Sequence, residues 1–305
     1  MPLGTLDMTI TTGDVFIPEV WSRETQRATQ ATLVLANTVK RFDEDVADAG
    51  DVLHVPMVSN INANSKAANT QVTLNAPTEN QFTMNISRHF ESSYLVEDRL
   101  KKQAKYNILN EYSPKAGYAI GLQMDTDLAG LYSGLSQSVG NSTTALNDTN
   151  LTRAIQYLDD ANAPQSDRNF AFKPAVLAQL RRISKFSEWT GLGFAPTPAG
   201  GAGGLSNASN GAVKQIGKNG FVGYVYGLIS CYMTTTLTEE AGTSDTIHNL
   251  LYHKEAFALG VQLQPRMQFQ YKQEYLGTLA TCDAIWGFGE YRDTFGVDVR
   301  TDDND

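Results

Sequence analysis

The sequence predicts an α+β fold, because helical and strand patterns occupy different stretches of its 305 residues. Apolar residues recur at helical spacing before residue 45 and again between residues 96 and 185. Two-residue alternation or strand-like character instead marks residues 51–90 and most of the chain after residue 213. Strands and helices do not alternate regularly, which argues against a parallel α/β sheet, and no internal repeat indicates a solenoid.

Residues 1–45 are expected to form an extended lead-in followed by an amphipathic helix. Ser22 can cap the start of this helix, and Glu24 would lie in its first turn, where a negative charge is favourable. The predicted apolar face, spaced by three and four residues, consists of Ala28, Ala31, Leu35, Val39 and Phe42. Nothing precedes the helix for this face to pack on, so the face needs a partner from elsewhere.

A long hairpin is predicted next, with strands at residues 51–58 and 81–90. The second strand alternates between the apolar residues Phe82, Met84 and Ile86 and the polar residues Thr83, Asn85 and Ser87. The intervening tip, residues 60–70, is polar and contains Lys66. Because an isolated hairpin is marginal in water, its apolar face should rest on another surface, either in its own domain or in another molecule.

The longest predicted helix begins at Ser113 and Pro114, since serine can cap a helix and proline is tolerated in its first turn. Its apolar stripe consists of Ile120, Met124, Leu128, Leu131 and Leu135. A helix of about 20 residues is about 30 Å long, so this one is expected to be a backbone element of the fold. Two shorter amphipathic helices are predicted at Asp148–Asp160 and Pro174–Lys185.

The second half of the chain is expected to contain a loop and then mostly strands. The segment Trp189–Val213 carries no charge and is rich in glycine, so it is predicted to be a mobile loop. The apolar run Phe221–Met233 is shorter than the roughly 20 residues that span a bilayer, and it indicates buried β structure. Cys231 and Cys282 lie in apolar segments, so both are expected to be buried and reduced.

The formal net charge of -9 disfavours a protein that reads DNA through a phosphate-binding face, although an acidic wall could enclose DNA without adhering to it. No phosphate-binding loop, zinc motif or hydrolase nucleophile motif is complete. The sequence therefore predicts no catalytic residue, cofactor or metal, and no enzyme. One basic helical surface could contact a nucleic-acid backbone or be a solvated helix face, and it consists of Arg99, Lys101, Lys102 and Lys105.

Short stretches of the chain follow one another in a characteristic order: residues 16–21 (FIPEVW), 169–174 (NFAFKP), 220–229 (GFVGYVYGLI), 252–258 (YHKEAFA) and 287–292 (GFGEYR). Together with the order of predicted elements, they resemble the major capsid proteins of tailed bacteriophages, which have the Hong Kong 97-type fold. The resemblance covers nearly the whole chain, and its order is more specific than any one stretch. It implies an N-terminal arm (1–47), an extended hairpin loop (48–92), a peripheral domain with a spine helix (93–140), an axial domain (141–250) and return strands of both domains (251–305).

The resemblance further implies a structural subunit that self-assembles through hexamers and pentamers into an icosahedral head around double-stranded DNA. The expected location is the virion, after assembly in the bacterial host cytoplasm and with no membrane. The implied partners are a separate scaffolding protein, a portal, a decoration protein and non-specifically contacted DNA. Inter-subunit contacts are expected at Leu35, Val39, Lys66, Phe82, Met84 and Ile86.

Two other functions remain open from the sequence. An encapsulin-like compartment shell shares the implied fold and would hold protein cargo instead of DNA. An enzyme whose catalytic groups converge from distant positions would leave no local motif.

Overall fold

The computed structural model describes residues 33–47, 50–104, 108–183, 221–226, 229–240 and 246–302. All of these belong to one compact unit, Ala31–Asp305, which is distinct from residues 1–30. Some sequence predictions fall outside the described residues: the helix cap at Ser22, the stretch 16–21, Lys105 and the glycine-rich segment 189–213.

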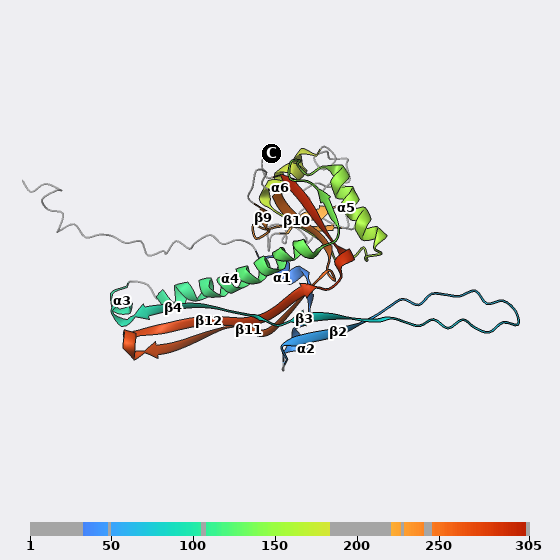
Figure 1. Ribbon diagram of the computed structural model, residues 1–305. Helices are drawn as coiled ribbons and strands as arrows, with labels where there is room; N and C mark the ends of the chain where they lie inside the picture. The colour runs from blue at the N-terminus through green and yellow to red at the C-terminus, as the bar shows by residue number, and fades with distance from the viewer. Residues whose placement is uncertain are drawn as a thin grey trace, which may run out of the picture. The chain divides into compact units, whose positions relative to one another are not determined.

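A four-stranded sheet with the order β1-β11-β12-β4 lies beside the long helix α4 (Ile108–Ala129), as Figure 1 shows. Its strands are β1 (Lys40–Arg41), β4 (Arg88–Glu97), β11 (Phe257–Lys272) and β12 (Gly277–Glu290). The three long strands pair antiparallel, and the short β1 pairs parallel with the start of β11. Trp286 of β12 is fully buried, and it belongs to the same core cluster as Ile120 and Leu128 of α4.

The helix α4 begins earlier than predicted, so Pro114 lies inside it and not in its first turn. Proline has no backbone N–H, and inside a helix it removes one hydrogen bond. Side chains support this turn, because Ser113 Oγ donates to the Leu109 carbonyl at 2.6 Å and Tyr94 OH donates to the same carbonyl at 3.1 Å. The predicted start at Ser113 is therefore wrong, because α4 already begins at Ile108. The two hydrogen bonds to the Leu109 carbonyl stabilise the helical turn that precedes Pro114.

The predicted apolar stripe of α4 is confirmed. Ile120, Met124 and Leu128 are buried, and Leu131 and Leu135 pack against the same core beyond the end of the helix. The chain continues from α4 into a short 3-10 helix, η2 (Gly130–Gly134), and a further short helix, α3 (Asp98–Gln103), precedes α4. The spacing of three and four residues thus directs one face of α4 to the sheet, as the sequence predicts.

A second sheet has seven strands in the order β5-β13-β10-β6-β8-β7, with β9 paired to β10. Its strands are β5 (Ser138–Gly140), β6 (Arg168–Phe172), β7 (Phe221–Val225), β8 (Ile229–Met233), β9 (Glu239–Glu240), β10 (Thr246–His253) and β13 (Gly296–Asp302). Every residue of β6 and β10 is buried. The apolar run predicted to be β structure forms β7 and β8, and none of the helices in the described ranges has the length and apolar character of a membrane span.

Two helices accompany the second sheet. The helix α5 (Asp148–Asp160) has the predicted bounds, and its start is capped by Asn147 Oδ1, which accepts the Asn150 N–H at 2.7 Å. The helix α6 (Pro174–Arg182) begins at the predicted proline and ends before the predicted Lys185. Both cysteines are buried and free, as predicted.

The N-terminal segment does not form a continuous helix up to Phe42, contrary to the prediction. It forms two short helices, α1 (Leu35–Thr38) and α2 (Asp43–Val46), separated by Val39 in an extended conformation and by β1. Pairing of β1 with β11 gives the extended residues backbone hydrogen bonds that a helix would otherwise supply. Tertiary pairing therefore overrides the helical periodicity in this segment.

A carboxylate on the long helix holds the start of α1. Asp125 is fully buried and accepts the backbone N–H groups of Val34, Leu35 and Ala36 at 2.6, 3.2 and 2.9 Å. Burial raises the pKa of Asp125, and these three donors partly offset the effect. The first N–H groups of a helix lack partners within the helix, so Asp125 acts as a cap supplied from a distant part of the chain.

Candidate assembly surface

The predicted hairpin is present as the antiparallel pair β2 (Val52–Val58) and β3 (Glu79–Asn85). Residues 59–78 connect the two strands, and Figure 1 shows them running side by side as a long extension of the hairpin. The second strand does not continue unbroken to Phe90, because it is interrupted at Ile86 and Ser87 before the chain enters β4. The hairpin and the four-stranded sheet are thus consecutive parts of one chain path.

The base of the hairpin packs on the subunit itself. Phe82 is 8% exposed and Met84 1%, and both join a small core that contains Phe42, Val46 and Ala258. The ring of Phe82 also meets the ring of Tyr291 edge-on, with 5.2 Å between the centroids. The sequence leaves open whether the apolar face of the hairpin packs in its own domain or on another molecule. At the base of the hairpin, this face packs on its own subunit.

Four of the expected inter-subunit residues are therefore located differently from the expectation. Leu35 and Val39 are each 1% exposed within the main core, and Phe82 and Met84 are buried at the hairpin base. These side chains offer no surface to a neighbouring molecule in the described conformation. The physical reason is that elements distant in sequence cover these apolar side chains. Leu35 and Val39 share a core with residues of α4, and Phe82 and Met84 share a core with Ala258 of β11.

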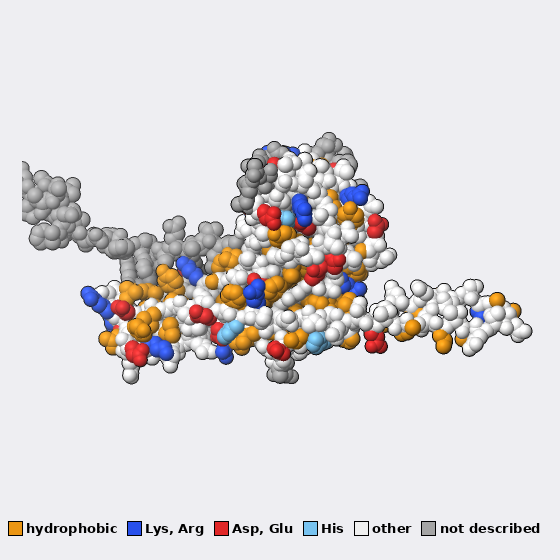
Figure 2. All heavy atoms as spheres, viewed as in Figure 1, with side chains coloured by type: hydrophobic (Ala, Val, Ile, Leu, Met, Phe, Trp, Pro, Cys, Tyr) orange, Lys and Arg blue, Asp and Glu red, His pale blue; other side chains and the backbone are white. Residues whose placement is uncertain are grey.

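The tip of the hairpin, residues 59–78, has no such cover. Every residue from 60 to 78 is exposed, including Lys66 at the end. Among these residues Ile61 is 65% exposed, Val72 59% and Leu74 86%. Figure 2 shows these arms with scattered apolar side chains and very little charge. Exposed apolar side chains mark an interaction site when they gather on one face of the molecule, and not when they are scattered singly.

A row of asparagines holds the two arms of the tip together. Continuing the β2–β3 register places Asn62 opposite Asn75 and Asn64 opposite Thr73. Asn64 Nδ2 donates to Asn75 Oδ1 at 2.7 Å and to the Thr73 carbonyl at 3.3 Å, and Asn75 Nδ2 donates to the Asn62 carbonyl. Thr78 N–H donates to Ser59 Oγ at 3.1 Å. One face of the tip is therefore a polar amide face.

The opposite face of the tip is apolar. When the β2–β3 register and its alternation are continued through residues 59–78, Ile61 and Ala63 of the first arm fall on the same side as Val72, Leu74 and Ala76 of the second arm. Phe82 and Met84, which are buried at the base of the hairpin, belong to this same side of the second arm. Polar residues separate them from the exposed apolar residues of the tip. The hairpin thus carries one apolar face, covered by its own unit at the base and uncovered at the tip.

Ile61, Val72 and Leu74 are functional candidates that the sequence reasoning missed. The signal was present as apolar residues alternating with asparagine and threonine on both sides of Lys66, in a segment whose other side chains are uncharged. Of the residues that were expected to contact a neighbour, Lys66 is exposed at the tip and Ile86 is half-buried at the base.

The basic surface predicted for DNA contact lies on α3 in its described part. Arg99 and Lys102 are exposed, while Lys101 bonds to Thr278 Oγ1 and lies 3.8 Å from Asp98. A lysine held by a structural partner is less available to a phosphate than a free one. Arg99 and Lys102 are therefore the more exposed basic side chains of α3, and Lys101 is partly exposed.

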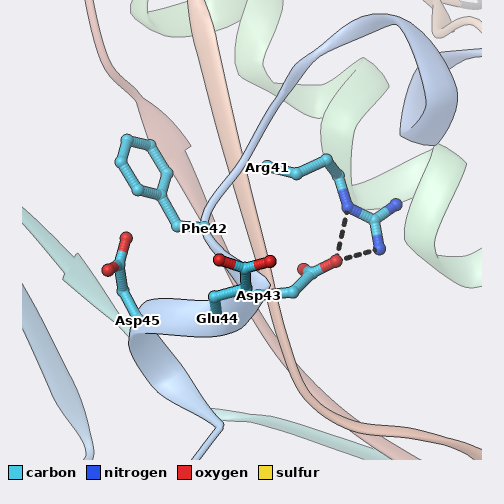
Figure 3. Close-up of a pocket in the computed structure, with 5 residues that line it drawn as sticks. All are labelled: Arg41, Phe42, Asp43, Glu44 and Asp45. Atoms are coloured by element: carbon cyan, nitrogen blue, oxygen red, sulfur yellow. Dashed lines mark hydrogen bonds and ion pairs between the residues drawn. The ribbon is translucent and has the colours of Figure 1, made fainter.

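A pocket beside α2 does not resemble a catalytic site (Figure 3). It is lined by the consecutive residues Arg41, Phe42, Asp43, Glu44 and Asp45. Arg41 Nη2 lies 2.7 Å from Asp43 Oδ2, and Asp43 Oδ1 accepts the Val261 N–H at 2.8 Å, so these groups hold α2 on β11. No group of three or more metal-ligating side chains occurs in the described ranges. The exposed hairpin tip is the stronger candidate site.

At the level of sequence, no protein-family model and no curated protein matches the chain. Its structure, however, is similar to solved structures from bacteriophages. A chain from Mycobacterium phage Che8 is 20% identical and aligns with a TM-score of 0.71 over 93% of this chain and 97% of that chain.

Two capsid structures give similar results. For the capsid of the cyanophage P-SCSP1u, the identity is 17% and the TM-score 0.72, over 95% of this chain and 94% of that chain. For the capsid of Ralstonia phage GP4, the identity is 13% and the TM-score 0.66, over 98% of this chain and 99% of that chain. The alignments span nearly the full length of both partners, so the chain has the fold of these phage capsid structures, within the α+β class that its sequence predicts.

Proposed function

We propose that this chain is a major capsid protein, a structural subunit that self-assembles into the icosahedral head of a bacteriophage around double-stranded DNA. The observation that carries the proposal is the uncovered apolar face of the hairpin tip, formed by Ile61, Val72 and Leu74. The tip is too thin to bury these side chains itself, whereas a neighbouring subunit can do so. The full-length similarity of the fold to phage capsid structures supports the same function.

The energetic argument rests on repetition. Full burial of one aliphatic side chain contributes about 1.5–3 kcal/mol, so a tip that buries three of them makes a modest contact. Around closed symmetry each subunit both gives and receives such a contact, and the shell becomes stable through multivalency. Because Lys66 is the one charged side chain of residues 59–78, the net charge of -9 does not oppose the contact at the tip.

The remaining contacts follow from the same proposal. Lys66 and Ile86 flank the apolar face and are proposed to touch the neighbouring subunit. Arg99, Lys101 and Lys102, together with Lys105 outside the described residues, are proposed to meet phosphates of packaged DNA without reading its sequence. The four-stranded sheet with α4 is proposed to form the peripheral domain, and the seven-stranded sheet to form the axial domain.

The proposed partners are further copies of the chain in hexamers and pentamers, a separate scaffolding protein, a portal and a decoration protein. The proposed location is the virion, after assembly in the bacterial cytoplasm. The two buried free thiols suit such a reducing compartment. In this role the subunit acts through its surfaces, without catalysis or a cofactor.

Electron microscopy of the expressed chain, with and without a co-expressed scaffolding protein, tests the proposal directly. Closed shells of uniform size are expected. A chain that stays monomeric at every concentration and melts at a ligand-dependent temperature would instead indicate an enzyme with a dispersed site. Purified shells that contain protein cargo and no DNA would indicate an encapsulin-like compartment.

Trypsin provides a site-specific test of where the tip lies. Lys66 is the one lysine or arginine between Arg41 and Arg88, so cleavage within the hairpin reports on the tip alone. We expect assembly to slow cleavage after Lys66 by at least about tenfold, because the bound tip must detach before the protease can act. The measurement is the rate of appearance of the two fragments by mass spectrometry. Equal rates for free subunits and intact shells would contradict the proposed contact.

A further inference from the structure

His248 is a buried histidine of β10, and both nitrogens of its ring face carboxylates. Nδ1 lies 2.9 and 3.1 Å from the two carboxylate oxygens of Asp298, on β13. Nε2 lies 3.7 Å from Glu240 Oε1, on β9, and has no hydrogen-bond partner among the described residues. Both β9 and β13 pair with β10, so the ring stands between side chains of two neighbouring strands.

A neutral histidine ring cannot satisfy both of these carboxylates. It carries a hydrogen on one nitrogen and a lone pair on the other, so either tautomer turns a lone pair toward a carboxylate oxygen. The doubly protonated ring has a donor for each carboxylate, and its positive charge attracts both acids. The geometry around His248 therefore suits the charged form of the ring.

The other charged groups around the ring leave one negative charge without a partner. Asp298 is 1% exposed and already accepts the Arg300 Nε–H at 2.8 Å, so Arg300 balances this acid. Arg300 also lies opposite His248 in the β10–β13 register, where its charge opposes a charge on the ring. Among the described residues, the one cationic partner within ion-pair distance of Glu240 is His248 itself. A proton on the ring makes the group of four side chains neutral.

Tyr132 covers the ring of His248 and contacts the same acid. It lies in η2, which follows α4, and its ring stacks on His248 with 3.9 Å between the centroids. Its hydroxyl donates to Glu240 Oε1 at 3.1 Å, the oxygen that also faces Nε2. Burial, followed by the hydrogen bond to Glu240, raises the pKa of Tyr132, so this hydroxyl keeps its proton. Glu240 thus joins β9 both to β10 and to the chain that leaves α4.

We propose that His248 is a proton-operated clamp that holds β9 on the second sheet. With both nitrogens protonated, the ring bridges Asp298 and Glu240; when it returns one proton to solvent, it keeps Asp298 and releases Glu240. The strand β9 has two residues, both paired with β10, so side-chain links matter to its attachment. The clamp belongs to the subunit itself and does not rest on the proposed assembly function.

The clamp tightens as the pH falls. Histidine is the side chain that ordinarily gains its charge between pH 8 and pH 5. The link to Glu240 is therefore present toward the acid end of this interval and lost toward the alkaline end. The Glu240 side chain is 62% exposed, so solvent screens the ion pair. We expect an effect on the order of fivefold in the equilibrium between attached and detached β9.

Hydrogen exchange of the His248 backbone amide tests the clamp, because this N–H donates to the Thr238 carbonyl, next to β9, at 3.1 Å. In the unassembled full-length subunit, we expect its exchange, corrected for intrinsic rates, to be about fivefold slower at pH 5.5 than at pH 8. In Glu240→Gln the side chain is uncharged, while its oxygen can still accept the Tyr132 hydroxyl. We expect this variant to lose the difference between the two pH values.

Glu239→Gln is the matched control, because Glu239 is the other residue of β9 and pairs with Lys173 instead of a histidine. A pair of lysine and carboxylate keeps its charges between pH 5.5 and pH 8, so this variant should loosen β9 equally at both and retain the fivefold difference. A difference that survives in Glu240→Gln would overturn the proposal. If that variant does not fold, nitrogen NMR of wild type decides, since a His248 ring with a hydrogen on one nitrogen alone at pH 5.5 excludes the clamp.

Discussion

Replacing the three exposed apolar side chains of the hairpin tip is expected to abolish shell formation and to leave the subunit folded. The variant is Ile61→Thr, Val72→Thr and Leu74→Gln, which keeps side chains of similar size. All three residues are more than half exposed, so they contribute little to the folding of the isolated subunit. In a shell they would be buried, and their loss removes about 3–6 kcal/mol from each contact between subunits.

An effect of that size corresponds to at least a hundredfold weaker contact, and it recurs at every subunit of the shell. Shell yield is measured by sedimentation and electron microscopy, and folding of the free subunit by its melting temperature. We expect no closed shells and a melting temperature within about 2 °C of wild type. Normal shells at wild-type yield would show that the apolar face of the tip does not hold neighbours together.

The polar face of the same tip provides the control. Asn60→Ser and Gln71→Ser alter the opposite side of the two arms, and neither side chain takes part in the asparagine bonds between the arms. This double variant should assemble like wild type. If it fails as completely as the apolar variant, the tip acts through its overall conformation and not through its apolar face.

The parts of the fold that follow from short-range patterns could be predicted from the sequence. The helix Asp148–Asp160 has a capping asparagine just before it and an apolar stripe along it, and both signals act within a few residues. The stripe from Ile120 to Leu128 and the alternation within the second hairpin strand are equally local. In each case the physical cause lies inside the window that a periodicity samples.

The N-terminal segment could not be predicted in this way, because distant residues determine its structure. Asp125 caps α1 across 90 positions of sequence at Leu35, and β11 pairs with β1 from the far end of the chain. Val39 fits a helical stripe equally well, but here it is extended between a helix and a strand. Periodicity identifies an apolar face and does not identify the surface that covers it.

The same limit explains the division of the hairpin. Alternation predicts that Phe82 and Met84 share an apolar face, and the structure confirms that face. This face can be buried by its own subunit only where the hairpin lies close to the rest of that subunit. The sequence does not give that distance. The cover reaches the base and ends before Ile61, so the candidate contact residues move from the base to the tip.

Replacing the buried cap Asp125 by asparagine is expected to destabilise the subunit by about 2–4 kcal/mol. Its two carboxylate oxygens accept three backbone N–H groups, from Val34, Leu35 and Ala36. An asparagine offers one oxygen and directs an NH₂ group at N–H donors, so at least one buried donor loses its acceptor. Urea denaturation of the free subunit measures the change in the free energy of unfolding.

Asp160→Asn is the matched control, since Asp160 is exposed at the end of α5, and it should change the free energy of unfolding by no more than about 0.5 kcal/mol. The effect of Asp125→Asn should also be local before it is global. The amides of Leu35 and Ala36 should exchange faster than those of α5 in the variant, because the segment that loses its cap opens first. An unchanged free energy of unfolding would mean that water replaces the carboxylate at no cost, and that β1 alone anchors the N-terminal segment to the sheet.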